Sequence, residues 1–137
     1  MALIVKSSTM MAEDILRLKS LIRAKAFLRR HQPEEPFELA SGGKSWVYFD
    51  CKPITQDPEA LNLIAELIFS RIKDYGVDAI GGLESGAIPI STAVALLSFQ
   101  KGRPIPSFWV RQRRKEHGTK NWIEGTLKPN SKVVIID

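Results

Sequence analysis

The sequence predicts an α/β fold in which a parallel sheet is flanked by helices. Three observations carry this prediction: an amphipathic helix over residues 57–75, a strand–helix–strand unit over residues 77–111, and a short apolar strand over residues 132–136. The length of 137 residues corresponds to a single domain. With 44% hydrophobic and 26% charged residues, the composition excludes disordered, collagen-like and coiled-coil chains.

The residue pattern in the N-terminal part of the chain predicts one helix and two strands. Residues 12–30 carry apolar side chains at helical spacing, and Pro33 follows as a stop signal. Residues 1–11 before this helix are a candidate disordered tail. Two short strands follow over residues 37–40 and 46–50, and we expect them to be joined by the turn Ser41, Gly42 and Gly43.

The helix over residues 57–75 has the clearest boundaries. Asp57 is a good N-cap, Pro58 suits the first helical position, and Gly76 suits the C-terminal stop. Its apolar residues recur three and four positions apart, which predicts one buried stripe.

The second half of the chain predicts a βαβ unit. A strand over residues 77–82, a turn, a helix over residues 87–100 and a strand over residues 105–111 require parallel strands and a right-handed crossover. A polar loop over residues 112–131 separates this unit from the strand at 132–136. A three-stranded sheet with an uncovered last strand is a poor end for a domain, so we expect the C-terminal part of the core to be missing.

The positive charge is concentrated in two segments. Residues 1–30 hold seven basic and two acidic groups, and residues 101–120 hold seven basic and one acidic group. An anionic partner such as a phosphate, a carboxylate or a nucleic acid is a fair hypothesis. The single cysteine, Cys51, suits a reducing compartment, and no apolar stretch is long enough to span a bilayer. We therefore expect a cytoplasmic protein without a membrane partner.

Three places could carry chemistry. The glycine-rich turn over residues 81–86 is either a plain βα turn or an anion cradle built from backbone N–H groups. Residues 111–120 hold five cations and a histidine, which fits the binding of phosphate oxygens, a nucleic acid or a solvated charged loop. Asp137 follows a strand, so its carboxylate is either a ligand for Mg²⁺ or sugar hydroxyls or a simple terminal group.

Four stretches in this order and spacing resemble the orotate phosphoribosyltransferases of pyrimidine biosynthesis: residues 37–50, 81–89, 110–118 and 123–137. The resemblance implies a type I phosphoribosyltransferase fold, with a small N-terminal hood over residues 12–50 and a partial α/β core over residues 57–137. It also implies that orotate and phosphoribosyl diphosphate give orotidine monophosphate and pyrophosphate, with Mg²⁺. The family forms homodimers in which the mobile basic loop reaches into the partner's active site.

The resemblance also implies roles for individual residues. Lys115 matches the catalytic lysine, and Asp137 matches an acid that would also hold the metal ion. The residues that match the site for phosphoribosyl diphosphate are Glu84, Ser85, Gly86, Arg111, Lys115, His117 and Asp137. The residues in the stretch facing the orotate pocket are Ser41, Gly42, Lys44, Tyr48 and Phe49.

The chain departs from the family pattern at several points. Ala40 and Gly86 stand where some members of the family carry lysine, and Gln112 stands where many do. The second acid and the Thr/Gly-rich ribose-phosphate loop are absent. These departures indicate either a fragment of a longer enzyme or a non-catalytic, nucleotide-binding or regulatory relative. An RNA-binding module and a purine-specific transferase are less favoured alternatives.

Overall fold

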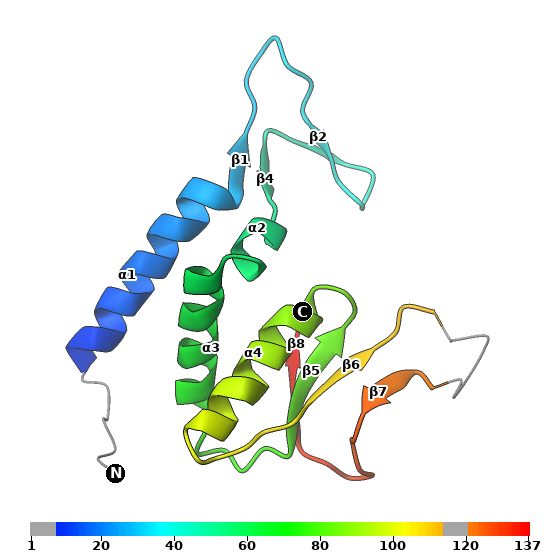
Figure 1. The fold of residues 1–137 in the computed structure, drawn as a ribbon. Helices are drawn as coiled ribbons and strands as arrows, with labels where there is room; N and C mark the ends of the chain where they lie inside the picture. Colours follow the sequence, from blue (N-terminus) through cyan, green and yellow to red (C-terminus); the bar gives the residue numbers. More distant parts are fainter. Residues whose placement is uncertain (1–7, 114–120) are drawn as a thin grey trace. The chain divides into compact units, whose positions relative to one another are not determined.

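The structure is a computed structural model that describes residues 8–113 and 121–137. The chain divides into two compact units, Met1–Ala60 and Leu61–Asp137. The predicted hood falls in the first unit, and most of the predicted α/β core falls in the second (Figure 1). Among the described residues, no helix combines the length and the apolarity needed to cross a membrane.

The first unit begins with helix α1 (Ser8–Lys25) and strand β1 (Phe27–Arg29), so the predicted helix ends about five residues too late. β1 pairs antiparallel with β4 (Val47–Phe49). The rings of Phe27 and Phe49 lie 5.1 Å apart across this pair. This cross-strand contact with a distant segment outweighs the local helical pattern. The candidate tail over residues 1–11 is wrong for residues 8–11, which belong to α1, and residues 1–7 lie outside the described residues.

A separate hairpin joins β2 (Phe37–Glu38) to β3 (Lys44–Ser45). The two predicted strands correspond to β2 and β4, but the turn expected between them joins β2 to β3 instead. The Leu39 N–H donates to the Gly43 carbonyl and the Gly42 N–H donates to the Leu39 carbonyl, each over 2.8 Å. Gly42 has φ +83°, which glycine adopts without strain. This tight turn places β3 opposite β2 and leaves β4 to pair with β1.

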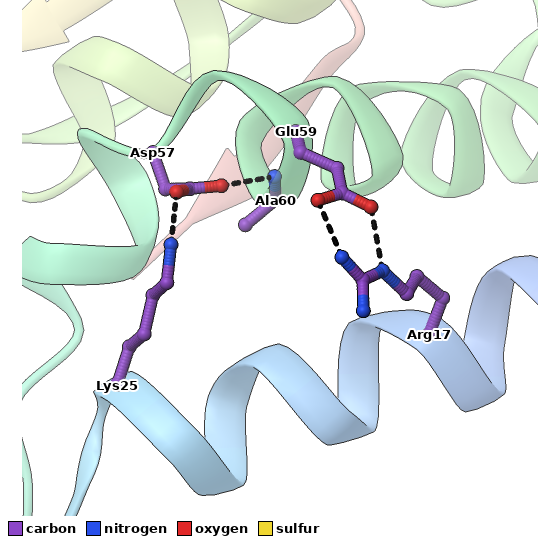
Figure 2. Close-up of polar contacts among 5 residues, drawn as sticks. All are labelled: Arg17, Lys25, Asp57, Glu59 and Ala60. Carbon is purple, nitrogen blue, oxygen red and sulfur yellow. Dashed lines mark hydrogen bonds and ion pairs between the residues drawn. The ribbon is translucent and has the colours of Figure 1, made fainter.

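A short helix that the sequence does not predict, α2 (Lys52–Thr55), precedes α3 (Pro58–Ile72). The predicted cap is confirmed, because the Ala60 N–H donates to Asp57 Oδ1 over 2.9 Å. Lys25 of α1 pairs with the same carboxylate, and Arg17 donates two hydrogen bonds to Glu59 over 2.6 and 2.7 Å (Figure 2). Two cations of α1 are thus paired with carboxylates at the start of α3.

These pairs shift the ionisation of their members. The hydrogen bond from Lys25 lowers the pKa of Asp57, and the bond from the Ala60 N–H lowers it further. The hydrogen bond from Arg17 lowers the pKa of Glu59, and the same bond raises the pKa of Arg17. The carboxylates therefore remain charged at a lower pH than free carboxyl groups do.

The second unit is built on a four-stranded sheet in the order β7-β6-β5-β8. β5 (Ala79–Leu83) lies parallel to both β6 (Ser107–Val110) and β8 (Val133–Ile136), as the sequence predicts. Helix α4 (Ala87–Gln100) has the predicted bounds. β7 (Ile123–Gly125) pairs antiparallel with β6, inside the stretch predicted as a loop. Three residues ending in glycine give too weak a pattern to identify this strand from the sequence.

The core of the second unit lies between its helices and its sheet. Seven buried apolar side chains form one cluster: Ala65, Phe69, Ile72, Ile80, Val94, Leu97 and Ile105. Ser98 of α4 is also fully buried, and it accepts a hydrogen bond from the Ile105 N–H over 2.8 Å. This bond ties the end of α4 to the segment that leads into β6.

Candidate functional site

The carboxyl ends of three parallel strands form one edge of the sheet in the second unit. Leu83 of β5 lies opposite Val110 of β6, and Gly82 lies opposite Ile136 of β8. The next residues along these strands are Glu84, Arg111 and Asp137, so all three follow at this edge. In open α/β sheets, ligands bind at the carboxyl ends of the strands.

The turn between β5 and α4 contributes backbone groups to this edge. Gly86 is the N-cap of α4 and makes no side-chain cap bond. The first N–H groups of a helix lack partners within the helix and attract anions. A Cβ at Gly86 would meet no atom within 4 Å, so the space beside this turn is open. The Glu84–Ser85 peptide bond in the turn is cis.

Glycines also let β5 fit between its two neighbours. A Cβ at Gly81 would collide with the carbonyl oxygen of Phe108, and a Cβ at Gly82 would collide with that of Ile136. These positions therefore accept no larger residue without a shift of the neighbouring strands.

Arg111 lies between two carboxylates at the same edge. Its Nε donates to Glu124 Oε1 over 2.8 Å, and its Nη1 lies 3.9 Å from Glu84 Oε2. The side chains of all three residues are partly buried, between 22% and 28% exposed. Sequence reasoning missed Glu124, because its strand was predicted to be a loop.

Gln112 connects the end of β6 to the turn after β5. Its backbone N–H donates to Glu84 Oε1, and its side-chain Nε2 donates to the Glu84 carbonyl, each over 3.1 Å. The glutamine that departs from the family pattern thus holds the Glu84 turn in place. Gln112 lies within the basic segment over residues 111–120.

Several predicted site residues are not placed. Lys115 and His117 lie outside the described residues, so their predicted contacts with a diphosphate stay predictions. Asp137 is described and borders an apolar groove of about 520 Å³ along α3 and β8. Its other lining residues are Leu67, Ile68, Arg71, Ile72, Val134, Ile135 and Ile136. This groove has one cation and no glycine turn, so it lacks the features expected of the predicted diphosphate site.

The five predicted orotate residues all lie in the first unit, in two groups. Ser41, Gly42 and Lys44 belong to the β2–β3 hairpin. Tyr48 contacts the ring of Phe37 in the same hairpin, at 5.5 Å between ring centres. Successive residues of a strand point to opposite faces, so Phe49 faces away from Tyr48. The first unit therefore brings Tyr48, but not Phe49, toward the hairpin.

The first unit also has a polar groove of about 320 Å³. It is lined by Arg29, Arg30, His31, Gln32 and Trp46. None of these residues is predicted to bind orotate, so the predicted pocket and the groove of this unit are different places.

No family model matches the chain. A curated orotate phosphoribosyltransferase of Bradyrhizobium sp. strain BTAi1 is 43% identical over 125 residues, which cover 88% of this chain and 65% of that protein. The crystal structure of Mycobacterium tuberculosis H37Rv orotate phosphoribosyltransferase in complex with Fe(III) dicitrate matches with a TM-score of 0.71 and 30% identity, covering 89% of this chain and 65% of that one. The same enzyme in complex with phosphoribosyl diphosphate gives a TM-score of 0.65 and 29% identity, over 89% and 62% of the two chains.

The chain thus spans somewhat less than two thirds of these relatives. The similarity nevertheless extends over most of the chain, in sequence and in fold. It favours the transferase over the regulatory and RNA-binding alternatives. Over most of its length, the chain resembles the orotate phosphoribosyltransferases in sequence and in fold, and its α/β architecture is that of the type I phosphoribosyltransferases.

Proposed function

We propose that this protein transfers the phosphoribosyl group of phosphoribosyl diphosphate to orotate, giving orotidine monophosphate and pyrophosphate in pyrimidine biosynthesis. The observation that carries the proposal is the shared edge of β5, β6 and β8. It brings an uncapped helix start, the cation of Arg111 and the acid of Asp137 to one side of the sheet. The relative of known structure that binds phosphoribosyl diphosphate supports the same substrate.

The chemistry suits these groups. As the bond between ribose C1 and the diphosphate breaks, negative charge grows on the leaving pyrophosphate. The Ile88 N–H donates to the Ser85 carbonyl over 3.3 Å, and Pro89 has no N–H, so the N–H groups of Gly86 and Ala87 are the ones at the start of α4 that can face an anion. Together with the guanidinium of Arg111 they can stabilise that charge, because they are already oriented before the reaction. Lys115 would add a cation from the basic segment, and His117 would add a ring N–H donor. We propose Lys115 as the catalytic residue on the family resemblance.

The residues at this edge are compatible with Mg²⁺. Within the described ranges, no group of three or more His, Cys, Asp or Glu side chains could hold a metal ion. Protein-bound Mg²⁺ commonly uses only one or two carboxylates, with water and substrate phosphates as its other ligands. Asp137 would supply such a carboxylate. When bound, Mg²⁺ would neutralise charge on the diphosphate.

We also propose that the protein works as a homodimer with shared active sites, as the resemblance implies. Mixing a Lys115→Ala variant with an Arg111→Ala variant tests this sharing. If the two residues serve different subunits' sites, mixed dimers should regain activity that neither variant has alone. Mixtures with no more activity than the separate variants would contradict shared sites. The cytoplasmic location stays a prediction.

Two experiments test the transferase proposal. Calorimetry on the 137-residue chain should detect binding of phosphoribosyl diphosphate or orotidine monophosphate. Binding of neither would contradict the proposed substrates. The chain can also be joined to the part of the Bradyrhizobium enzyme that it does not span, and orotate consumption measured.

Variants of the joined protein then test the role of Lys115. Lys115→Ala should lower kcat by at least about 100-fold, the scale of losing one group that stabilises transition-state charge. The matched control Lys128→Ala removes an exposed lysine and should leave kcat unchanged. Normal activity of Lys115→Ala would refute its catalytic role.

A further inference from the structure

The clearest unassigned interaction at the sheet edge is the contact between Arg111 and Glu124. Arg111 Nε donates to Glu124 Oε1 over 2.8 Å, with the two side chains 28% and 22% exposed. This distance is typical of a charge-assisted hydrogen bond. Partial burial reduces the screening by water that weakens exposed ion pairs.

The register of two strands creates this contact. Val110 of β6 lies opposite Ile123 of β7, and the Arg111 N–H donates to the Trp122 carbonyl over 2.9 Å. Arg111 is therefore level with Trp122, and Glu124 is its diagonal neighbour two residues along β7. Diagonal neighbours of an antiparallel pair share a face and lie within reach of long side chains. The backbone thus presents Glu124 to Arg111 on the side away from the strand end.

The atoms involved determine what remains free for a ligand. A guanidinium has five N–H donors in a planar fork, of which Nε carries one. Glu124 takes the Nε donor and so orients the plane of the group. Nη1 lies 3.9 Å from Glu84 Oε2, which is too long for a hydrogen bond. The Nη donors are therefore not taken up by Glu84 and can bind phosphate oxygens.

We infer that Glu124 is a positioning residue for Arg111: it holds the guanidinium through Nε so that the Nη donors face the diphosphate site. This inference rests on the proposed function. An arginine without this partner would have to lose more side-chain freedom when it binds a phosphate, and affinity would fall. Glutamine at position 124 keeps an oxygen that accepts from Nε, whereas alanine keeps none.

The experiment compares three variants of the 137-residue chain. Glu124→Ala removes the acceptor, Glu124→Gln retains one, and Glu66→Ala is the matched control. Glu66 pairs with Lys101 over 3.1 Å, so the control also breaks an ion pair of the second unit, at a place outside the sheet edge. Inorganic pyrophosphate and phosphoribosyl diphosphate are the probes, and calorimetry measures their dissociation constants.

Glu124→Ala should weaken binding of both probes about tenfold, which corresponds to the loss of one charge-assisted hydrogen bond. Glu124→Gln should recover most of the affinity, and Glu66→Ala should bind as the unchanged chain does. If Glu124 only supported the fold, Glu124→Gln would not recover the affinity for the probes that Glu124→Ala loses. The Arg111 Nε–H signal in NMR gives a readout without ligand: it should be protected from solvent exchange, and lose protection in Glu124→Ala alone.

Two results would overturn the inference about Glu124 without contradicting the proposed function. One is unchanged probe affinity in Glu124→Ala, and the other is an equal loss in Glu66→Ala. If the unchanged chain binds neither probe while its Arg111 Nε–H is protected, the proposed function fails and the inference fails with it. The NMR signal reports the hydrogen bond between Arg111 and Glu124 without a ligand, so it shows whether the contact or the proposed ligand is at fault.

Discussion

Replacing Ser98 by alanine should destabilise the second unit through one lost hydrogen bond. Ser98 Oγ accepts from the Ile105 N–H over 2.8 Å and donates to the Ala95 carbonyl over 2.7 Å. Ser98 is 0% exposed and Ile105 is 6% exposed, so water does not readily replace the lost acceptor. A buried N–H left without a partner costs about 1–3 kcal/mol, and we expect about 2 kcal/mol here.

Helix α4 offers a matched control for this variant. Ser91 is also 0% exposed, but its Oγ donates only within the helix, to the Ile88 carbonyl over 3.2 Å. That carbonyl also accepts the usual helical N–H, so Ser91→Ala leaves no buried group unpaired. We expect Ser91→Ala to change the free energy of unfolding by less than about 0.5 kcal/mol.

Urea denaturation followed by tryptophan fluorescence measures both effects. With a slope of about 2 kcal/mol per molar urea, the Ser98→Ala midpoint should fall by about 1 M while the slope stays the same. The Ser91→Ala midpoint should stay close to that of the unchanged chain. Equal midpoints for the two variants would refute the reasoning that the Ile105 N–H depends on Ser98.

Packing and charge lead to three other expected outcomes. Gly82→Ala places a methyl group against the Ile136 carbonyl and should lower the free energy of unfolding, measured by urea denaturation, by about 2 kcal/mol. Gly86→Ala is the control, because its methyl group lies in open space, and an equal loss of stability in the two variants would contradict this. Ile80 is 0% exposed, so Ile80→Ala leaves a cavity in the core and should lower the free energy of unfolding by about 3–4 kcal/mol. A loss of less than about 1 kcal/mol would show that the core is not packed as described. The stability contributed by Asp57 should be complete above its ordinary pKa of about 4 and be lost as the pH falls through its lowered pKa, because the unfolded chain then binds more protons. The difference in unfolding free energy between Asp57→Asn and the unchanged chain should therefore shrink below about pH 4, and a constant difference would contradict the pairing with Lys25.

Local signals predicted α4, the start of α3 and the parallel strands. α4 has the predicted bounds because a mostly apolar segment lies between Gly86 and Gly102, which has φ +74°. α3 starts as predicted because Asp57 caps it. Such features depend on neighbours in the sequence, so a pattern along the chain is sufficient to find them.

The short strands could not be found in this way. β1 and β7 have three residues each, and both exist through pairing with segments more than ten residues away. The sheet edge with Glu84, Arg111 and Asp137 follows from the βαβ pattern, because parallel strands end on the same side. Glu124 required the register of β7 against β6, which only the folded structure supplies. The missed positioning residue and the missed strand therefore have the same cause.

Strand β8 has a consequence for how the protein behaves in concentrated solution. Within residues 8–113 and 121–137, its backbone pairs with β5 alone, and Ile135 at its centre is 63% exposed. An apolar strand with one open side offers unpaired N–H and C=O groups to strands of other molecules. Preparations of this chain should therefore associate as concentration rises, and a lysine at position 135 should delay that association while leaving the Gly82 and Ile136 pairing intact.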